Sequence, residues 1–440
     1  VSFFALSGGW RRARYEGDTW RALKSPVAAA LVSWPVRVLC GAIGVLVFGV
    51  AVYAGLKGTE APDRNASLTI IYVTAWLGFP IFSIFLGNIF SAFNPWKAVS
   101  SVVGRTFRLA SPEGPAHLRY PEKLGRWPAA VGLVAFVWLE LVFSQGSDVS
   151  AGVVPHDLGV AGIAYTVYTF VMVGIFGREA WFKYGEIFSV YFGMFGSLGK
   201  FEVREGVLGV RRFLAGSTSW VSGGRTGAAS IAGSVAVVIA SIGTTTFDGA
   251  QEGVFKGGVE WVFDRMIDIG ASPTVALRTS GTVFMLISIT IVTLIYFLGV
   301  RGMSTVPGGP DRTALWRGFG HVLIPIAFAY LLAHYFSLIY YQEQAQFTYL
   351  LSDPLGTGTT DLFGTAGSGV DYTGLSNQLI WYIQVAALVG GHVAGLVLAH
   401  DRAISYWGDY RLAARSQYWM LAVMVAFTCF GLFLLSVSNV

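Results

Sequence analysis

Charged residues are scarce in this chain: 12% of its 440 residues are Asp, Glu, Lys or Arg, whereas 54% are hydrophobic. An ordinary soluble domain carries about 25% charged residues. A chain of this length would form two or three soluble domains, and each would need a charged surface that this composition cannot provide. The scarcity of charge therefore excludes a set of soluble domains and favours a protein surrounded by lipid.

Cysteine and the common nucleotide-binding motifs are also scarce or absent. The 2 cysteines, Cys40 and Cys429, lie within apolar runs, which excludes a disulfide framework. The sequence contains no G-x-x-x-x-G-K-[ST] loop, no strand-to-helix G-x-G-x-x-G and no G-x-S-x-G elbow. The net charge of +5 reflects Lys and Arg gathered on one side of a membrane, so we expect no nucleic-acid partner.

Long apolar runs fill most of the chain. Nine are long enough to cross a hydrocarbon layer of about 30 Å, which takes about 20 residues. The runs are roughly 31–55, 68–92, 127–146, 157–177, 226–247, 279–300, 317–341, 379–400 and 417–437. Glycine is frequent, as is usual where transmembrane helices pack closely. We therefore predict an all-α fold, a polytopic transmembrane helical bundle that forms a single integral membrane domain over residues 1–440.

Basic residues alternate between the gaps that separate these runs. Of the 30 Lys and Arg, all but five lie in 1–30, at Arg37, and in 93–126, 178–225, 301–317 and 401–415. The exceptions are Lys57, Arg64, Lys256, Arg265 and Arg278. Cytoplasmic loops retain Lys and Arg, whereas exported loops lose them. The pattern predicts a multi-pass protein of the cell's inner (plasma) membrane, with a cytoplasmic first loop and the C-terminus outside.

Three segments fall outside this simple pattern. Val1–Gly8 is an apolar stub too short to span, and we interpret it as the end of a truncated transmembrane helix or a mis-called start, with a surface-lying apolar turn as the alternative. Segment 178–200 is apolar but carries Arg178, Glu179, Lys183 and Glu186, which favours an interfacial or partly buried helix on the cytoplasmic side. Loop 342–378 is the longest outward segment, and a loop of that length is more often functional, or a lid, than idle.

Four histidines lie on two neighbouring apolar runs: His321 and His334 on 317–341, and His392 and His400 on 379–400. Ionisable residues inside membrane spans are functional candidates. Because neutral imidazole is a common metal ligand, the four residues predict a site for a Zn-like divalent metal, completed by a carboxylate such as Glu186 or Asp401. The sequence has neither an H-E-x-x-H nor a C-x-x-C spacing. The alternative to a metal site is that each histidine forms a hydrogen bond to a neighbouring helix.

Haem ligation is a second interpretation of the same histidines. Dihaem cytochrome b proteins place two histidines on each of two helices at matched spacing. Here one pair is 13 residues apart and the other is 8 apart. Two stacked haems therefore fit badly, which leaves one bis-histidine haem as an alternative to the divalent metal.

Two glutamates complete the set of candidate catalytic residues. Glu140 lies in the outer half of run 127–146 and needs a partner across helices, for which His334 is at similar depth. We predict a polar pocket that contains both, includes Tyr330 or Gln384, and opens toward loop 342–378. Glu186 has no basic residue four positions later, so it is expected to point into the bundle as a ligand or general base.

Several stretches carry a resemblance to a known family: HVLIPIAFAYLLAHYFS, SDPLGTGTTDLFGT, WYIQVAALVGGHVAGLVLAHDRA, FNPWKAV and FGREAWFKYGEIFSVYFG. They resemble bacterial polytopic membrane proteins named fenitrothion hydrolases, and the resemblance covers nearly the whole chain. It implies hydrolysis of an organophosphate triester. It assigns no catalytic residues, and Leu331 stands where the family often has a histidine.

Two functions follow from these observations. The first is metal-assisted hydrolysis at an intramembrane His/Glu site, where a divalent ion would activate water and polarise a phosphoryl oxygen. The second is non-enzymatic: a transporter, or an integral subunit of a larger respiratory or metal- or haem-handling membrane complex. In both, membrane lipid surrounds the protein, and other membrane subunits are expected only in the second.

The split of basic residues predicts the orientation of the chain. A reporter active only in the cytoplasm should be active when fused within 93–126 and inactive when fused after Val440. A reporter active only outside should give the reverse pattern. Activity of the cytoplasmic reporter after Val440 would contradict the nine-span count and the depths assigned to Glu140 and His334.

Overall fold

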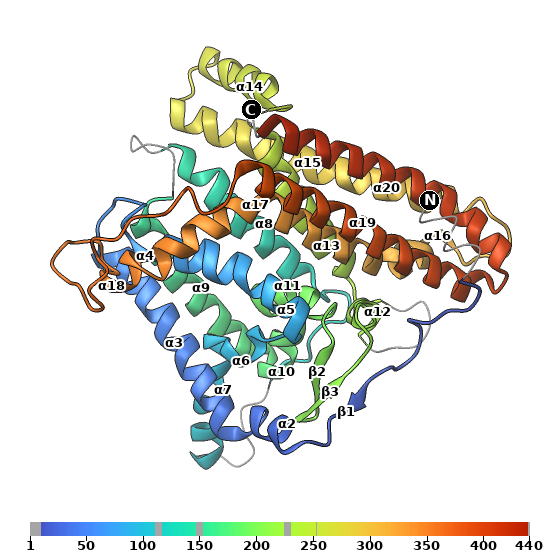
Figure 1. Cartoon of the computed structure of the whole chain (residues 1–440), viewed down its shortest axis with the longest axis horizontal. Coiled ribbons are helices and arrows are strands. Elements are labelled where there is room, and N and C mark those ends of the chain that lie inside the picture. Colours follow the sequence, from blue (N-terminus) through green and yellow to red (C-terminus); the bar gives the residue numbers. More distant parts are fainter. Residues whose placement is uncertain (1–9, 111–116, 147–152, 224–229, 252, 439–440) are drawn as a thin grey trace.

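A computed structural model of the chain describes residues 10–110, 117–146, 153–223, 230–251 and 253–438. Within these ranges the protein is a bundle of helices with one small sheet (Figure 1). The apolar stub predicted at Val1–Gly8 lies outside the described residues.

The first half of the described chain contains the three short strands and most of the short helices. Its elements are β1 (Arg21–Ala22), α2 (Pro26–Leu31), α3 (Trp34–Lys57), α4 (Ala66–Leu68), the π-helix η1 (Thr69–Gly78), α5 (Phe79–Leu86), α6 (Phe90–Phe93), α7 (Pro95–Ala110), α8 (Trp127–Leu141), the 3-10 helix η2 (Phe143–Gly146), α9 (Pro155–Phe176), α10 (Arg178–Ala180), the π-helix η3 (Trp181–Gly185), α11 (Ile187–Gly196), β2 (Phe201–Arg204), β3 (Val207–Val210) and α12 (Gly216–Ser222).

The second half contains the longest helices. Its elements are α13 (Ser234–Gln251), α14 (Lys256–Asp268), α15 (Pro273–Met303), α16 (Arg312–Phe319), the 3-10 helix η4 (Gly320–Leu323), α17 (Ile324–Gln346), α18 (Tyr349–Ser352), α19 (Asn377–Trp407) and α20 (Tyr410–Ser438).

Seven helical segments of the described chain are long and apolar enough to cross a membrane. They are Trp34–Lys57, Ala66–Leu86, Pro155–Phe176, Pro273–Met303, Arg312–Ser352, Asn377–Trp407 and Tyr410–Phe433. Each corresponds to one of the nine predicted runs, which confirms the helical multi-pass membrane class. The count of nine stays a prediction.

The two remaining runs form helices of a different kind. Helix α8 has 15 residues, which is about 22 Å at 1.5 Å per residue and short of the hydrocarbon thickness. Helix α13 has 18 residues, and most of its side chains are buried against the rest of the protein. Helix α13 therefore lies in the interior of the bundle, while α8 also exposes apolar side chains such as Trp127 and Val131.

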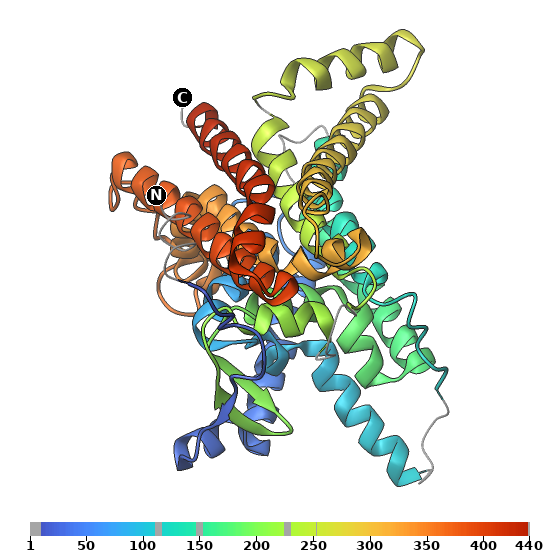
Figure 2. The same ribbon diagram turned by 90° about the vertical axis from the view of Figure 1, so that its right-hand side faces the viewer.

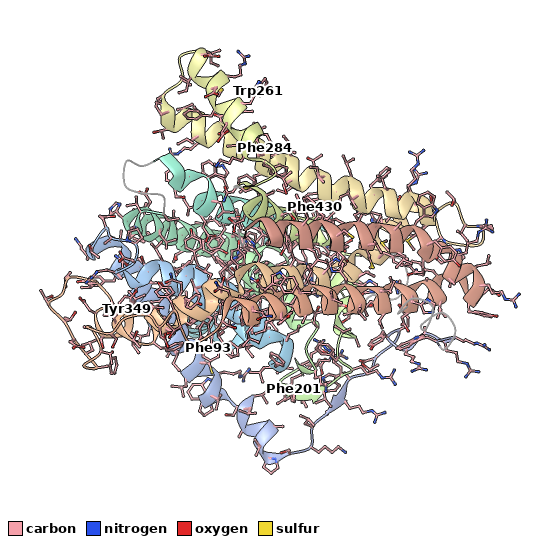
Figure 3. All side chains as sticks on the ribbon, turned by 45° about the horizontal axis from the view of Figure 1, so that its top comes forward. Phe93, Phe201, Trp261, Phe284, Tyr349 and Phe430 are labelled. Carbon is pink, nitrogen blue, oxygen red and sulfur yellow. The ribbon has the colours of Figure 1, made fainter. Side chains whose placement is uncertain are left out.

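Apolar side chains project outward from the long helices, as Figure 3 shows over the surface of the bundle. Leu46 of α3, Phe85 of α5, Leu298 of α15 and Val425 of α20 are all exposed in the isolated chain. Large apolar side chains in such numbers at the surface are expected where lipid replaces water as the surround. The outside of the bundle is thus suited to contact membrane lipid.

The connections between helices gather at two ends of the bundle. We call the end that carries the sheet the sheet end, at the right and lower right of Figure 1, and the end that carries residues 353–376 the loop end, at the left. At the loop end the amide of Thr59 donates to the carbonyl of Leu355 over 2.8 Å, and the amide of Ala66 donates to that of Pro354 over 3.1 Å. Helix α14 also lies away from the sheet (Figures 1 and 2).

The small sheet has the order β1-β3-β2, and both pairs are antiparallel. Strands β2 and β3 form a hairpin, with Glu202 opposite Gly209, while Ala22 of β1 pairs with the same glycine. A Cβ at Gly209 would lie 2.3 Å from the ring of Trp20, so only glycine allows that indole to cover the sheet. The sequence analysis did not predict this sheet.

Helices α17 and α19 pack along each other at the centre of the second half. A Cβ at Gly391 would meet Ala329 and Pro325, and a Cβ at Gly395 would meet Val322 and Ile326. The residue numbers fall on one helix as they rise on the other, so the two helices run antiparallel. Glycines at the contact allow the backbones to approach closely, as is common between membrane helices.

This close approach predicts different effects for two adjacent glycines. A Cβ at Gly391 would lie 2.1 Å from that of Ala329, whereas a Cβ at Gly390 would have nothing within 4 Å. Gly391→Ala should lower the free energy of unfolding by about 1–3 kcal/mol, because the helices must separate. Gly390→Ala should leave it unchanged or raise it by up to about 1 kcal/mol. Denaturant titrations of both variants measure the difference, and equal effects would contradict the packing.

Candidate functional site

A largely enclosed carboxylate joins helices α13 and α17. Asp248 of α13 accepts a hydrogen bond from Nε2 of His334 over 2.9 Å and one from the hydroxyl of Tyr335 over 2.7 Å, both at Oδ2. Its other oxygen, Oδ1, accepts from Nε2 of Gln251 over 3.1 Å. The side chains of Asp248 and His334 are each 16% exposed, so the pair is largely enclosed but still reachable.

The sequence around Asp248 explains why α17 can approach it. The hydroxyls of Thr244, Thr245 and Thr246 donate to carbonyls one turn back, so the polar side chains of α13 are satisfied within the helix. Gly249 follows Asp248 directly, and a Cβ there would lie 3.4 Å from both Cε1 of His334 and the hydroxyl of Tyr330. The missing side chain leaves the imidazole and the phenol room beside the helix.

A second carboxyl, that of Glu140, lies close to Asp248. It comes from α8 and interacts electrostatically with Asp248. The phenols of Tyr72, Tyr191 and Tyr335 also lie within electrostatic range of Glu140. We call Glu140, Asp248, His334 and Tyr335 the acid–base cluster. Four helices and the π-helix η1 therefore converge on one polar region in an otherwise apolar interior.

The acid–base cluster contains two residues that the sequence analysis had singled out. Glu140 and His334 were predicted to share a pocket, and the structure places both beside Asp248, with Tyr330 nearby. The sequence analysis had missed the roles of Asp248 and Tyr335. An aspartate that follows three threonines in a buried helix was the available signal, because such a charge requires partners.

Glu186, the other predicted catalytic glutamate, is fully buried and caps helix α11. Its carboxylate accepts from the amides of Phe188 over 3.0 Å and Ser189 over 2.8 Å. It also accepts from Nδ2 of Asn94 over 3.1 Å and from the hydroxyl of Tyr165 over 2.6 Å. Four donors thus occupy the two oxygens, which is the arrangement of a structural anion at a helix N-terminus.

A lysine supplies positive charge close to this cap. Burial lowers the pKa of Lys97, while the carboxylates of Glu179 and Glu186 oppose the shift. Its Nζ donates to the hydroxyl of Ser91 over 2.7 Å. A general base at Glu186 would first have to release its four hydrogen bonds.

The other three predicted ligands, His321, His392 and His400, lie toward the sheet end and away from His334. Nδ1 of His321 donates to the carbonyl of Gly318, and Nδ1 of His392 donates to that of Leu388, each over 2.8 Å. His400 donates through Nε2 to the carbonyl of Trp10 over 3.1 Å. Each ring therefore has one nitrogen bonded to backbone, and the bonds of His321 and His392 stay within their own helical turns.

The metal prediction is not tested by this arrangement. Among the residues that the structure describes, no group of three or more His, Cys, Asp or Glu side chains lies close enough together to hold a metal ion. His392 keeps a buried Nε2 with no hydrogen-bond partner in the same ranges. A divalent ion at His321, His334, His392 and His400 stays a prediction, as does a bis-histidine haem.

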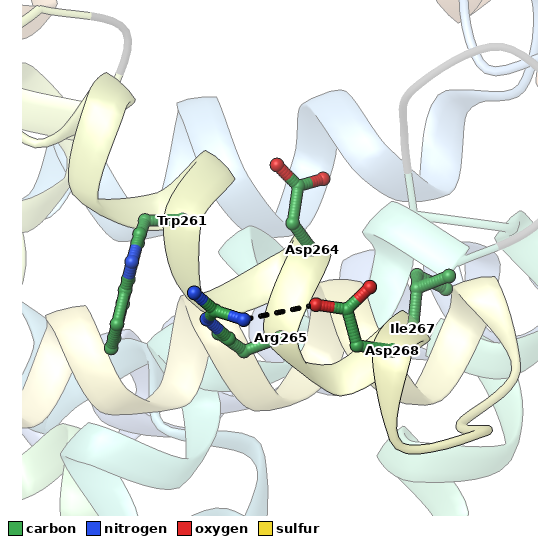
Figure 4. A pocket seen from close by; sticks show the side chains of 5 residues that line it. All are labelled: Trp261, Asp264, Arg265, Ile267 and Asp268. Carbon is green, nitrogen blue, oxygen red and sulfur yellow. Dashed lines mark hydrogen bonds and ion pairs between the residues drawn. The ribbon is translucent and has the colours of Figure 1, made fainter.

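Helix α14 carries a surface hollow that is less suited to chemistry. It is lined by Trp261, Asp264, Arg265, Ile267 and Asp268 (Figure 4). The ion pair between Arg265 and Asp268, 3.2 Å long, has both side chains more than 60% exposed. Exposed pairs of this kind contribute little energy and leave no polar group desolvated. The hollow is therefore a feature of the protein surface, and the acid–base cluster is the better candidate site.

Comparisons with known proteins add no family assignment. Neither a protein-family model, nor a curated protein, nor a solved structure matches this chain.

The two predicted glutamates can be separated by experiment. Glu186→Ala removes the acceptor of four buried donors and should lower the free energy of unfolding by about 3 kcal/mol or more. Glu179→Ala, whose side chain is 83% exposed, is the matched control and should change it by less than about 0.5 kcal/mol. Thermal or denaturant unfolding in detergent measures both changes, and a fully stable Glu186→Ala would show that the cap is unimportant.

Proposed function

We propose that the acid–base cluster is a membrane-embedded catalytic site that hydrolyses an apolar ester, of the organophosphate class implied by the resemblance to fenitrothion hydrolases. The observation that supports it is the hydrogen bond between Asp248 and Nε2 of His334 in a largely enclosed part of the bundle. A carboxylate that orients an imidazole is a recurring device for general-base catalysis. An apolar triester would reach such a site by dissolving in the surrounding lipid.

His334 is the general base in this proposal. The bond to Asp248 holds the imidazole proton on Nε2 and leaves Nδ1 as the acceptor, on the side of the ring that faces Gly249. A water bound there gives its proton to Nδ1 as its oxygen attacks phosphorus. Asp248 then stabilises the imidazolium that forms, as the orienting carboxylate does in other Asp–His pairs.

Glu140 is the acid. Two carboxyl groups that interact in a water-poor region are most stable with one negative charge between them. Asp248 accepts three hydrogen bonds, so the charge resides there and the proton resides on Glu140. The bond from phosphorus to the leaving oxygen breaks, and Glu140 gives that oxygen its proton. The imidazolium of His334 returns a proton to the Glu140 carboxylate through water, which restores the starting state.

A metal-assisted version of this reaction needs a ligand shell that the described residues do not form as they stand. The Asp248 carboxylate already accepts three hydrogen bonds, and three of the four predicted histidines lie toward the sheet end. The steps above are therefore written for protein side chains alone, and metal dependence is left to direct measurement.

The same cluster would also serve a non-enzymatic protein. Carboxyl, imidazole and phenol groups that contact one another inside a membrane can pass a proton from one side to the other. The acid–base cluster therefore favours a second candidate function. This is a proton-coupled transporter, or a subunit of a larger membrane complex.

The orientation in the membrane completes the proposal. The basic residues around the sheet and near the ends of α16 and α19 lie at the sheet end (Figure 1). By the positive-inside rule, that end would face the cytoplasm of a cell with this protein in its inner membrane. The loop end and the C-terminus are then outside. The acid–base cluster lies in the outer half and would receive substrate and water from that side.

Substitutions in the cluster should abolish hydrolysis without unfolding the protein. Purified protein in detergent or nanodiscs is given fenitrothion, and release of the coloured nitrophenolate is followed. His334→Gln and Glu140→Gln should each lower the rate by at least about 100-fold, the usual contribution of a general acid or base. The controls are His156→Gln and Glu260→Gln, both at exposed positions, which should retain the wild-type rate.

Other outcomes of this assay separate the alternatives. Wild-type activity in His334→Gln would contradict the catalytic role of the cluster. Loss of activity on treatment of the wild-type protein with a chelator, restored by a divalent metal, would favour the metal-assisted reaction. An inactive wild-type protein that carries protons across liposome membranes, and loses this with Glu140→Gln, would identify the transporter.

A further inference from the structure

A hollow of about 700 Å³ at the sheet end gathers positive charge. Arg11, Arg12, Arg14 and Arg212 line it, and Ala13, Glu16 and Thr19 complete the lining. The single acid is already used, because both oxygens of Glu16 accept from Nη1 of Arg402 over 2.8 Å. The hollow therefore presents four guanidinium groups, and the one carboxylate in its lining is already paired with Arg402.

The backbone that carries three of these arginines is fixed to helix α19. Asp401, which is buried, accepts from the amides of Arg14 over 2.5 Å and Tyr15 over 2.8 Å. It also accepts from the indole of Trp10 over 3.0 Å. A segment held by this many bonds to a buried carboxylate stays in place, so the hollow is a built feature of the fold.

Three of the four guanidinium groups, those of Arg11, Arg14 and Arg212, also have partners within the protein. The guanidinium of Arg14 lies over the ring of Trp10 at 4.3 Å, and that of Arg11 lies over Tyr410 at 5.4 Å. Nη1 of Arg212 donates to the carbonyl of Arg14 over 2.7 Å. Stacking and hydrogen bonding of this kind orient planar guanidinium groups for bidentate contact with phosphate.

The position of the hollow indicates which phosphate it meets. It lies beside the end of α19 at Trp407 and the start of α20 at Tyr410, where two membrane-spanning segments reach the surface. Tyr418 and Trp419, about two turns along α20, are exposed. Exposed aromatic side chains near helix ends are typical of the membrane–water interface. The arginines are therefore at the level of lipid headgroups.

We propose that this hollow binds a phosphate group, and that its source is the headgroup of an anionic phospholipid in the leaflet at the sheet end. Arginines in a pocket at the ends of membrane helices match the charge and geometry of such headgroups. The site is separate from the acid–base cluster and does not rest on the proposed hydrolysis.

The test uses the full-length chain in detergent, with thermal unfolding followed as ligand is added. The probes are short-chain phosphatidylglycerol, short-chain phosphatidylcholine and inorganic phosphate. Phosphatidylglycerol should raise the melting temperature in a saturable way, and phosphatidylcholine should have no effect. Arg11→Gln with Arg12→Gln should weaken the apparent affinity for phosphatidylglycerol on the order of 30-fold, from about fivefold for each charge lost near the headgroup.

A control with the same loss of charge makes the result specific. Arg301→Gln with Arg312→Gln removes two exposed arginines of the same end that do not line the hollow. This control should keep the wild-type affinity. Equal saturation by inorganic phosphate would support the phosphate site but assign it to a soluble ligand. Equal weakening in both double variants, or an equal effect of phosphatidylcholine, would overturn the proposal.

Discussion

A charge buried in an apolar bundle must be paired or hydrogen-bonded, and the arrangement of this protein's interior follows from that requirement. At Asp248 the carboxylate is satisfied by an imidazole, a phenol and an amide from two helices. These bonds fix α13 against α17 at one height and in one rotation. The neighbouring carboxyl of Glu140 then brings α8 to the same place, so one buried anion determines how three helices meet.

The same constraint acts at two other buried carboxylates, with a different outcome. Glu186 is surrounded by four donors and fixes the start of α11. Asp401 is surrounded by an indole and two amides and fixes the N-terminal segment on α19. At both, the partners are donors that cannot readily take up a proton. Only at Asp248 is the partner an imidazole, whose two ring nitrogens can serve as donor and acceptor.

The sequence predicted the long helices, because these depend on the length of the apolar runs and on the loops that separate them. It did not predict the sheet, whose strands have at most four residues each. The sheet also pairs Ala22 with Gly209, two residues that lie far apart in the sequence. Short strands with distant partners leave no periodic pattern. The cap at Glu186 was missed because Ser, Thr, Asp and Asn are the usual capping residues.

The candidate site was predictable in part for the same reason. Depth along the helices follows from topology, and depth placed Glu140 and His334 together. The rotation of each helix about its axis does not follow from topology. The sequence therefore could not predict the link through Asp248, or the separation of His334 from the other three predicted histidines. A carboxylate and an imidazole that are 86 residues apart meet only through the packing of α13 on α17.

The central claim is that Asp248 and His334 act as one acid–base unit. A double-mutant cycle tests it most directly, with the free energy of unfolding measured for the wild-type protein, Asp248→Asn, His334→Gln and the double variant. The account predicts a coupling energy of about 1–3 kcal/mol, because either substitution alone removes one partner of the same carboxylate–imidazole pair. Additive effects, with a coupling energy below about 0.5 kcal/mol, would contradict it.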